Sequence, residues 1–245
     1  MLASQFLMLT EAAGKTDGNS TFLKPLMSPA YQIVRADGSR ETPSTYTAPN
    51  LSSYEVFGAI ATEPDPDVLV VRYYVASNET LHGKQLNTSR RPRLTVFARG
   101  AVEGDEGGAN ASWKLVSHAG FNEPMVLECD RGDDDPSTPP QGPAAALGVR
   151  VIREWMAAVR DGRQLDTINN EIQVQFANGS GFARRKEIAP IKPMPIDGYT
   201  RLIATRSGRL LVLSYYATSR VATRGRPHLT VFLEDGGPLA GNWSM

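Results

Sequence analysis

The stretch RPRLTVF at residues 91–97 returns almost unchanged as RPHLTVF at residues 226–232 of this 245-residue chain. The likeness extends backwards from both copies. LVVRYYVAS at 69–77 resembles LVLSYYATS at 211–219, IAT at 60–62 recurs at 203–205, and QIVRADGS at 32–39 resembles QVQFANGS at 173–180. Similar blocks in the same order predict an internal duplication.

The segment between the repeats has a different composition. CDRGDDDPSTPPQGPAAA, residues 129–146, is acidic, rich in proline and glycine, and without apolar periodicity. These features are typical of a linker. We therefore divide the chain into a first unit at residues 1–128, the linker at 129–146, and a second unit at 147–245.

Each unit combines a helical pattern with short strands. In the first unit, MLASQFLMLTEAAG at residues 1–14 predicts an amphipathic helix and lacks the basic start of a signal peptide. In the second unit, Asp161-Gly162 ends a predicted helix. Asp37-Gly38 and Asn178-Gly179 predict hairpin turns. The fold class is α+β, with helices first and a curved antiparallel sheet afterwards. The apolar positions at helical spacing in the second unit are Leu147, Val151, Ile152, Trp155, Met156 and Val159.

The two units differ at their ends. Trp243 aligns with Trp113, and only two residues follow Trp243 in the sequence. We therefore expect the second unit to lack a counterpart of KLVSHAGFN at 114–122, which is the last strand of the first unit.

The order of a helix, QIVRADGS, VLVVRYYV, RPRLTVF and WKLVSHAGFN resembles the nuclear transport factor 2-like superfamily, in its SnoaL-like and polyketide-cyclase-like branches. The resemblance implies two tandem cone-shaped barrels, each a curved antiparallel sheet wrapped on N-terminal helices, with a pocket at the wide end. That superfamily includes ketosteroid isomerases, scytalone dehydratases, limonene-epoxide hydrolases and polyketide cyclases, so the fold does not name a reaction.

Strand alternation separates an inner from an outer face. Val71, Tyr73 and Val75 share the more apolar face of their strand, so we expect Tyr73 inside the cone. The other face carries Arg72 and Tyr74, which is too aromatic for a purely solvated surface. Relatives commonly dimerise through the outer sheet face, so the two units could pair as an internal pseudo-dimer. Alternatively, the linker tethers independent units, or the chain forms homo-oligomers.

The candidate ligand-binding residues all lie in the first unit. Tyr73 is either a core tyrosine or a ligand contact, and Arg35 and Tyr54 lie either at the pocket mouth or in surface and core positions. His118 and Asn122 are four residues apart on one strand face and could supply an acid or base, or else lie at the sheet edge or on the outer face. The resemblance transfers no catalytic residue, because no acid or base motif of the family can be matched here.

The second unit is poorer in such residues, with Phe176 in place of Arg35 and Ser214 in place of Arg72. Our leading hypothesis is a protein that binds a small, largely apolar molecule in the first unit, while the second unit serves structure and pairing. One alternative is an isomerase, dehydratase or cyclase that draws an acid/base pair from Tyr73, His118 and Asn122. Another is a scaffold whose cones are filled. Whether the protein is an enzyme stays open.

Composition argues against several other classes of protein. The 26 basic residues balance 26 acidic ones, without the basic tract of a nucleic-acid surface, and no apolar run is long enough for a membrane span. One cysteine, Cys129, and three scattered histidines predict no metal site. The sequence has no P-loop, no G-x-S-x-G and no dinucleotide-binding glycine motif, so we expect no cofactor.

Asparagine usage bears on localisation. Seven asparagines begin an Asn-X-Ser/Thr triplet, which favours a glycosylated, secreted or lumenal protein. The alternative is that asparagine, serine and threonine co-occur in turns. The triplets begin at Asn19, Asn50, Asn78, Asn87, Asn110, Asn178 and Asn242.

Overall fold

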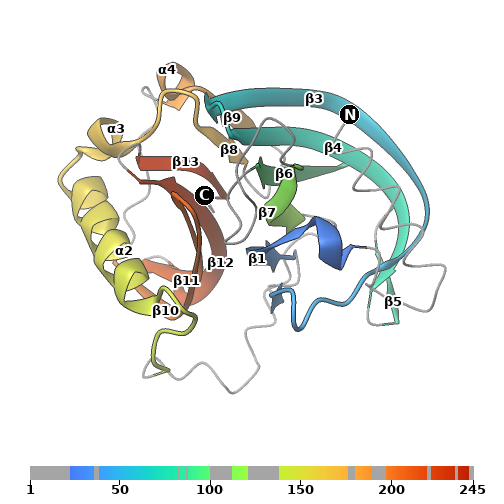
Figure 1. Ribbon diagram of the computed structural model, residues 1–245, viewed down its shortest axis with the longest axis horizontal. Helices are drawn as coiled ribbons and strands as arrows, with labels where there is room; N and C mark the ends of the chain where they lie inside the picture. The colour runs from blue at the N-terminus through green and yellow to red at the C-terminus, as the bar shows by residue number, and fades with distance from the viewer. Residues whose placement is uncertain are drawn as a thin grey trace.

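The computed structural model consists mainly of two β-sheets that pack against each other, with helix α2 (Ala145–Arg160) on the far side of one sheet (Figure 1). The residues that the structure describes are 23–35, 39–81, 83–86, 88–99, 112–120, 138–175, 180–188, 197–219, 222–234 and 237–242. Several predicted features lie outside these segments: the helix at 1–14, both hairpin turns, Asn122 and Cys129.

The first unit forms a sheet with the order β2-β1-β7-β6-β4-β3, in which β5 also pairs with β4. Neighbouring strands are antiparallel except β1 and β7, which are parallel. The strands are rich in valine, tyrosine and threonine, residues that suit a pleated, half-buried surface. The elements are η2 (Lys24–Leu26), β1 (Met27–Val34), β2 (Arg40–Glu41), β3 (Asn50–Asp65), β4 (Val68–Leu81), β5 (Lys84–Gln85), β6 (Arg91–Ala98) and β7 (Lys114–Gly120).

The second unit forms a sheet that, counted from β9, has the order β9-β8-β13-β12-β11-β10. Its parallel contact, between β13 and β8, occupies the same place as the contact between β7 and β1 in the first sheet. The elements after α2 are α3 (Gln164–Thr167), β8 (Gln173–Gln175), β9 (Gly181–Ala183), α4 (Arg185–Ile188), β10 (Gly198–Ser207), β11 (Leu210–Ser219), β12 (Ala222–Leu233) and β13 (Gly237–Asn242).

Strand β13 corrects the expectation that the second unit lacks its last strand. It pairs with β12 on one side and with β8 on the other, as β7 pairs with β6 and β1. The prediction was wrong because the strand, GPLAGN, precedes Trp243 instead of following it. Its glycine and proline residues have low strand propensity, so the strand is recognisable by its backbone pairing and not by its composition.

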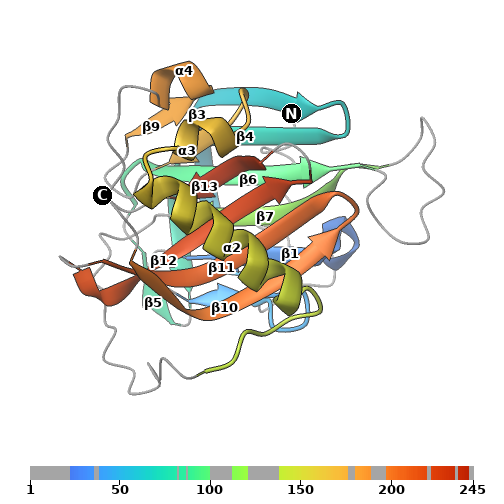
Figure 2. The ribbon, with the colours of Figure 1, turned by 90° about the vertical axis from the view of Figure 1, so that its left-hand side faces the viewer.

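Helix α2 lies across β10, β11 and β12 on the face of the second sheet that is turned away from the first sheet (Figure 2). Its buried side chains, among them Ile152 and Trp155, pack against Leu213, Tyr215 and Phe232 of the sheet. The helix begins at Ala145, so the last two residues of the predicted linker are helical. The α+β class is confirmed by this arrangement of sheets with few helices.

The corresponding inner face of the first sheet carries its own apolar core. Val71, Tyr73 and Val75 of β4 are buried there, as strand alternation predicts, together with Tyr31 of β1 and Tyr46 of the segment that follows β2. Tyr73 is therefore an interior residue of the first unit.

A third core joins the outer faces of the two sheets. Val70 of β4 and Val96 of β6 belong to the same buried cluster as Val212 of β11 and Val231 of β12. The face that carries Arg72 is thus buried against the second unit and is not a solvated surface. In the segments that the structure describes, no helix has the length and apolar character needed to cross a lipid bilayer.

Candidate functional site

A chain of buried hydrogen bonds runs across three strands on the inner face of the first sheet. Strand pairing places Val71 of β4 beside Thr95 of β6, and Thr95 beside His118 of β7. The Thr95 hydroxyl lies 3.2 Å from the Tyr73 hydroxyl and 2.8 Å from Nδ1 of His118. A single threonine therefore links the tyrosine and the histidine.

Two buried ion pairs lie on the same inner face. Arg35 donates to Glu41 Oε2 at 3.0 Å, and Arg93 lies 3.4 Å from Glu79 Oε2. Arg35 also donates to the Thr47 carbonyl oxygen, and its guanidinium lies 5.6 Å from the Tyr46 ring centroid. We call Arg35, Glu41, Tyr46, Tyr73, Glu79, Arg93, Thr95 and His118 the polar cluster; each of these residues is less than 10% exposed.

Burial sets the protonation states in this cluster. It lowers the pKa of His118 well below the usual value, and the nearby Arg93 and Arg35 charges lower it further. Burial raises the pKa of Tyr73, although its hydrogen bond to Thr95 opposes this, and raises the pKa of Tyr46 to about 12. At neutral pH, His118 is therefore an uncharged imidazole and Tyr73 a protonated phenol.

This arrangement can recognise or polarise a neutral polar group. The two arginines and two glutamates balance in charge, so the cluster offers directed hydrogen bonds and no net charge. A protonated tyrosine can donate to a carbonyl or hydroxyl oxygen, and a neutral imidazole can accept a proton. Tyr73 is fully buried and His118 nearly so, so these properties are available only to a group that reaches the interior of the first unit.

The structure brings together three of the five predicted site residues. Arg35, Tyr73 and His118 belong to the polar cluster, whereas Tyr54 is half-buried against the apolar core and Asn122 lies outside the described residues. Arg35 is only 7% exposed, and His118 faces the interior instead of the sheet edge or the outer face.

Other members of the cluster were missed in the sequence. Alternation along RPRLTVF places Arg93 and Thr95 on the face of Tyr73, and this signal could have found both residues. Glu41 and Tyr46 lie in or after the two-residue strand β2, where no periodicity exists to orient them.

The second unit offers an internal comparison for the polar cluster. Its sheet has the same order, and Tyr215 again lies 3.2 Å from a threonine hydroxyl, that of Thr230. The charged positions are not kept. Arg93 is the strand partner of Tyr73, and the second unit has His228 beside Tyr215 at this place. His118 is the strand partner of Thr95, and the second unit has Gly241 beside Thr230. Glu41 is the strand partner of Ile33, and the second unit has Phe182 beside Val174. The same sheet therefore forms without the charged set.

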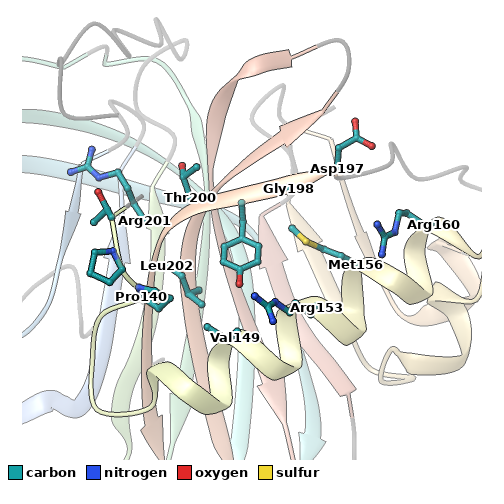
Figure 3. A pocket seen from close by; sticks show the side chains of 13 residues that line it. Pro140, Val149, Arg153, Met156, Arg160, Asp197, Gly198, Thr200, Arg201 and Leu202 are labelled. Atoms are coloured by element: carbon teal, nitrogen blue, oxygen red, sulfur yellow. The ribbon is translucent and has the colours of Figure 1, made fainter. Parts of the chain in front are cut away.

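A groove of about 800 Å³ lies in the second unit between α2 and β10 (Figure 3). Val149, Met156 and Leu202 supply apolar lining, while Arg153 and Arg160 extend from the exposed side of the helix. This hollow lies in the unit where the sequence led us to expect a mainly structural role.

The groove has a basic wall. Arg153 and Arg160 form no ion pair with any residue of the described segments, and Asp197 is the acidic residue of the lining. Arg201 points away from α2 (Figure 3), and its guanidinium lies 5.7 Å from the Tyr216 ring centroid. A molecule with an apolar body and an anionic group would fit this chemistry.

No family model matches the chain, and no curated protein matches it. Solved structures of nuclear transport factor 2-like proteins are similar to about half of it. One from Rhodospirillum rubrum is 20% identical, with a TM-score of 0.38, and the match covers 47% of this chain and 93% of that one. One from Cytophaga hutchinsonii is 14% identical, with a TM-score of 0.37, covering 48% and 93%. One from Prochlorococcus marinus is 16% identical, with a TM-score of 0.34, covering 48% and 89%.

Proposed function

We propose that the protein binds a small, largely apolar molecule in the first unit, where the polar cluster recognises an uncharged polar end of that molecule. The second unit supports and pairs with the first. The chain is, in this proposal, a tandem duplication of a cone-shaped domain, and the two copies form an internal pseudo-dimer.

One observation carries the proposal: the charged residues lie buried in one unit and are absent from the matching positions of the other. Replacing a buried ion pair by apolar residues of similar volume is often neutral or stabilising, so such pairs are not required for a stable core. The second unit builds the same sheet order with Phe182 and Gly241 at the positions of Glu41 and His118. Arg35 and Glu41 also hold the Thr47 backbone, and a function of the first unit accounts for the rest of the charged set, which the sheet itself does not require.

The experiment is a native mass spectrum beside a denaturing one, for protein purified from its natural host. Thr95→Val removes the hydroxyl that joins Tyr73 to His118 at nearly constant volume. Thr230→Val makes the same change beside Tyr215 in the second unit and is the matched control. We expect an adduct that is lost on denaturation, absent from Thr95→Val and retained in Thr230→Val.

A third variant, Arg153→Gln, tests the groove. Loss of the adduct in Arg153→Gln with retention in Thr95→Val would contradict the proposed site and move binding to the second unit. A clean protein mass in every spectrum would contradict the ligand-binding function and favour either a scaffold with filled interiors or an enzyme that has released its product.

A second candidate function is acid/base catalysis, favoured by the linkage of Tyr73 through Thr95 to His118. A neutral His118 could accept a proton from carbon beside a carbonyl group that Tyr73 polarises. The test is uptake of deuterium from solvent by carbonyl compounds, followed by mass spectrometry. Uptake that disappears in His118→Gln would support catalysis, and equal uptake in both proteins would contradict it.

Glycosylation and a secreted or lumenal location remain part of the proposal. Asn50 and Asn78, two of the asparagines that begin such triplets, are exposed on β3 and β4. A mass shift on treatment with an enzyme that removes N-linked glycans, for protein from the native source, tests this point.

A further inference from the structure

The interface between the two sheets has two halves, in which equivalent residues of the two units exchange places. Some polar contacts are the same in both halves. The Thr205 hydroxyl donates to the Ala30 carbonyl oxygen at 2.6 Å, and the equivalent Thr62 hydroxyl donates to the Glu171 carbonyl oxygen at 2.9 Å. Contacts that are the same in both halves would form equally well between two first units or two second units. They cannot select one partner over another.

Two other contacts are not the same in both halves. In one half, Arg72 of β4 lies against Gly181 of β9, where any side chain on Gly181 would overlap the guanidinium. In the other half, Arg40 of β2 donates to the Ser214 carbonyl oxygen of β11 at 3.2 Å and stacks on the Tyr216 ring at 4.6 Å.

Strand register shows that these are equivalent places with exchanged residues. Arg40 pairs with Val34 as Gly181 pairs with Gln175, so positions 40 and 181 correspond. Arg72 pairs with Ile60 as Ser214 pairs with Ile203, so positions 72 and 214 correspond. At these two positions each half of the interface therefore places one arginine opposite one small residue, and the arginine comes from β4 in one half and from β2 in the other. Arg201 also lies against the Tyr216 ring on which Arg40 stacks, 5.7 Å from its centroid.

We propose that these two contacts make the interface selective, so that a first unit pairs with a second unit and not with another first unit. Between two first units, Arg40 would stand at the place of Gly181, where even a Cβ would overlap the Arg72 guanidinium, so each half would force two arginine side chains into the space that Arg72 now fills alone. Between two second units, each half would place Ser214 opposite Gly181 and leave the space of both arginines empty. The selectivity concerns assembly and goes beyond the proposed ligand-binding function.

The test uses the full chain and moves one arginine across the interface. Gly181→Arg places a second arginine against Arg72, and we expect it to lower the midpoint of thermal unfolding by more than about 5 °C and to produce oligomers in light scattering. In the double variant Gly181→Arg/Arg72→Ser, the new arginine at position 181 faces a serine at position 72, as Arg40 faces Ser214 in the other half. We expect the double variant to recover more than half of the lost melting temperature and to return to the size of the unmodified protein.

The mirror experiment covers the case in which position 181 tolerates no side chain, because a Cβ there would also lie 2.8 Å from the Val174 carbonyl oxygen. Ser214→Arg places a second arginine beside Arg40, and Ser214→Arg with Arg40→Gly removes the conflict. Recovery in either double variant supports the proposal. Failure of both double variants to recover, with each no more stable than its single variant, would overturn it.

Discussion

Gln32 of the first sheet and Gln173 of the second sheet make equivalent hydrogen bonds, each to the opposite sheet. The amide nitrogen of Gln32 lies 2.8 Å from the Thr205 hydroxyl and 3.0 Å from the Val212 carbonyl oxygen. That of Gln173 lies 3.1 Å from the Thr62 hydroxyl and 2.8 Å from the Val70 carbonyl oxygen. Such reciprocity is expected of a two-fold interface and supports the proposed internal pseudo-dimer.

Removal of these amides should destabilise the chain unequally. Gln32→Leu and Gln173→Leu each leave buried acceptors without a donor, which costs about 1–3 kcal/mol. Gln32 should cost more, because its carbonyl oxygen also accepts from the Ser214 hydroxyl at 2.5 Å, whereas that of Gln173 has no hydrogen-bond partner among the residues that the structure describes. Urea unfolding of both variants, with exposed Glu154→Gln as control, checks this order. A larger loss in Gln173→Leu would contradict it.

Close packing of α2 gives a second prediction. A Cβ on Gly148 would lie 2.5 Å from the Ala204 Cβ and 3.0 Å from Leu213 Cδ2. Gly148→Ala should therefore lower the free energy of unfolding by about 1–3 kcal/mol through overpacking, although alanine is the better helix former by about 1 kcal/mol. Gly148→Ala with Ala204→Gly should recover stability because it restores the space. Equal stability of the single variant and the unmodified protein in urea unfolding would show that the helix has room to shift.

The buried His118 predicts a dependence of stability on pH. Its pKa is lowered in the folded protein, so below about pH 6.5, the ordinary histidine value, the unfolded chain binds a proton that the folded chain does not. Stability should be unaffected by this group above that pH and should fall on acidification, by at most about 1.4 kcal/mol per pH unit, down to the folded pKa. In His118→Asn, the slope of unfolding free energy against pH between 6.5 and 5 should decrease. An unchanged slope would place the titration elsewhere.

Much of the sheet structure follows from the sequence, because alternation is a strong local signal. Val71, Tyr73 and Val75 face the interior as predicted, and the segment VLVVRYYVAS lies within β4. Strand β13 was missed, since its glycines and proline carry no such signal and its place depends on pairing with β12 and β8.

Three of the eight residues of the polar cluster were predicted from the sequence. Arg35, Tyr73 and His118 were candidates because they lie on strands with a readable face, but their meeting point depends on strand order, which alternation does not give. The exchange of Arg40 and Arg72 across the interface depends on the packing of one sheet on the other, so no local pattern could reveal it.

The most direct test of the central claim is the stability and ligand content of Arg35→Met/Glu41→Leu, which replaces the shorter buried ion pair by apolar side chains. Each single variant leaves a buried charge unpaired and should lose about 3–5 kcal/mol. The double variant should lose less than either single variant, and its remaining loss should come from the Thr47 carbonyl oxygen and N–H, which Arg35 and Glu41 now bond. Native mass spectra of the double variant should show no adduct. A double variant that loses as much stability as the single variants and keeps its adduct would contradict the claim that these charges serve binding.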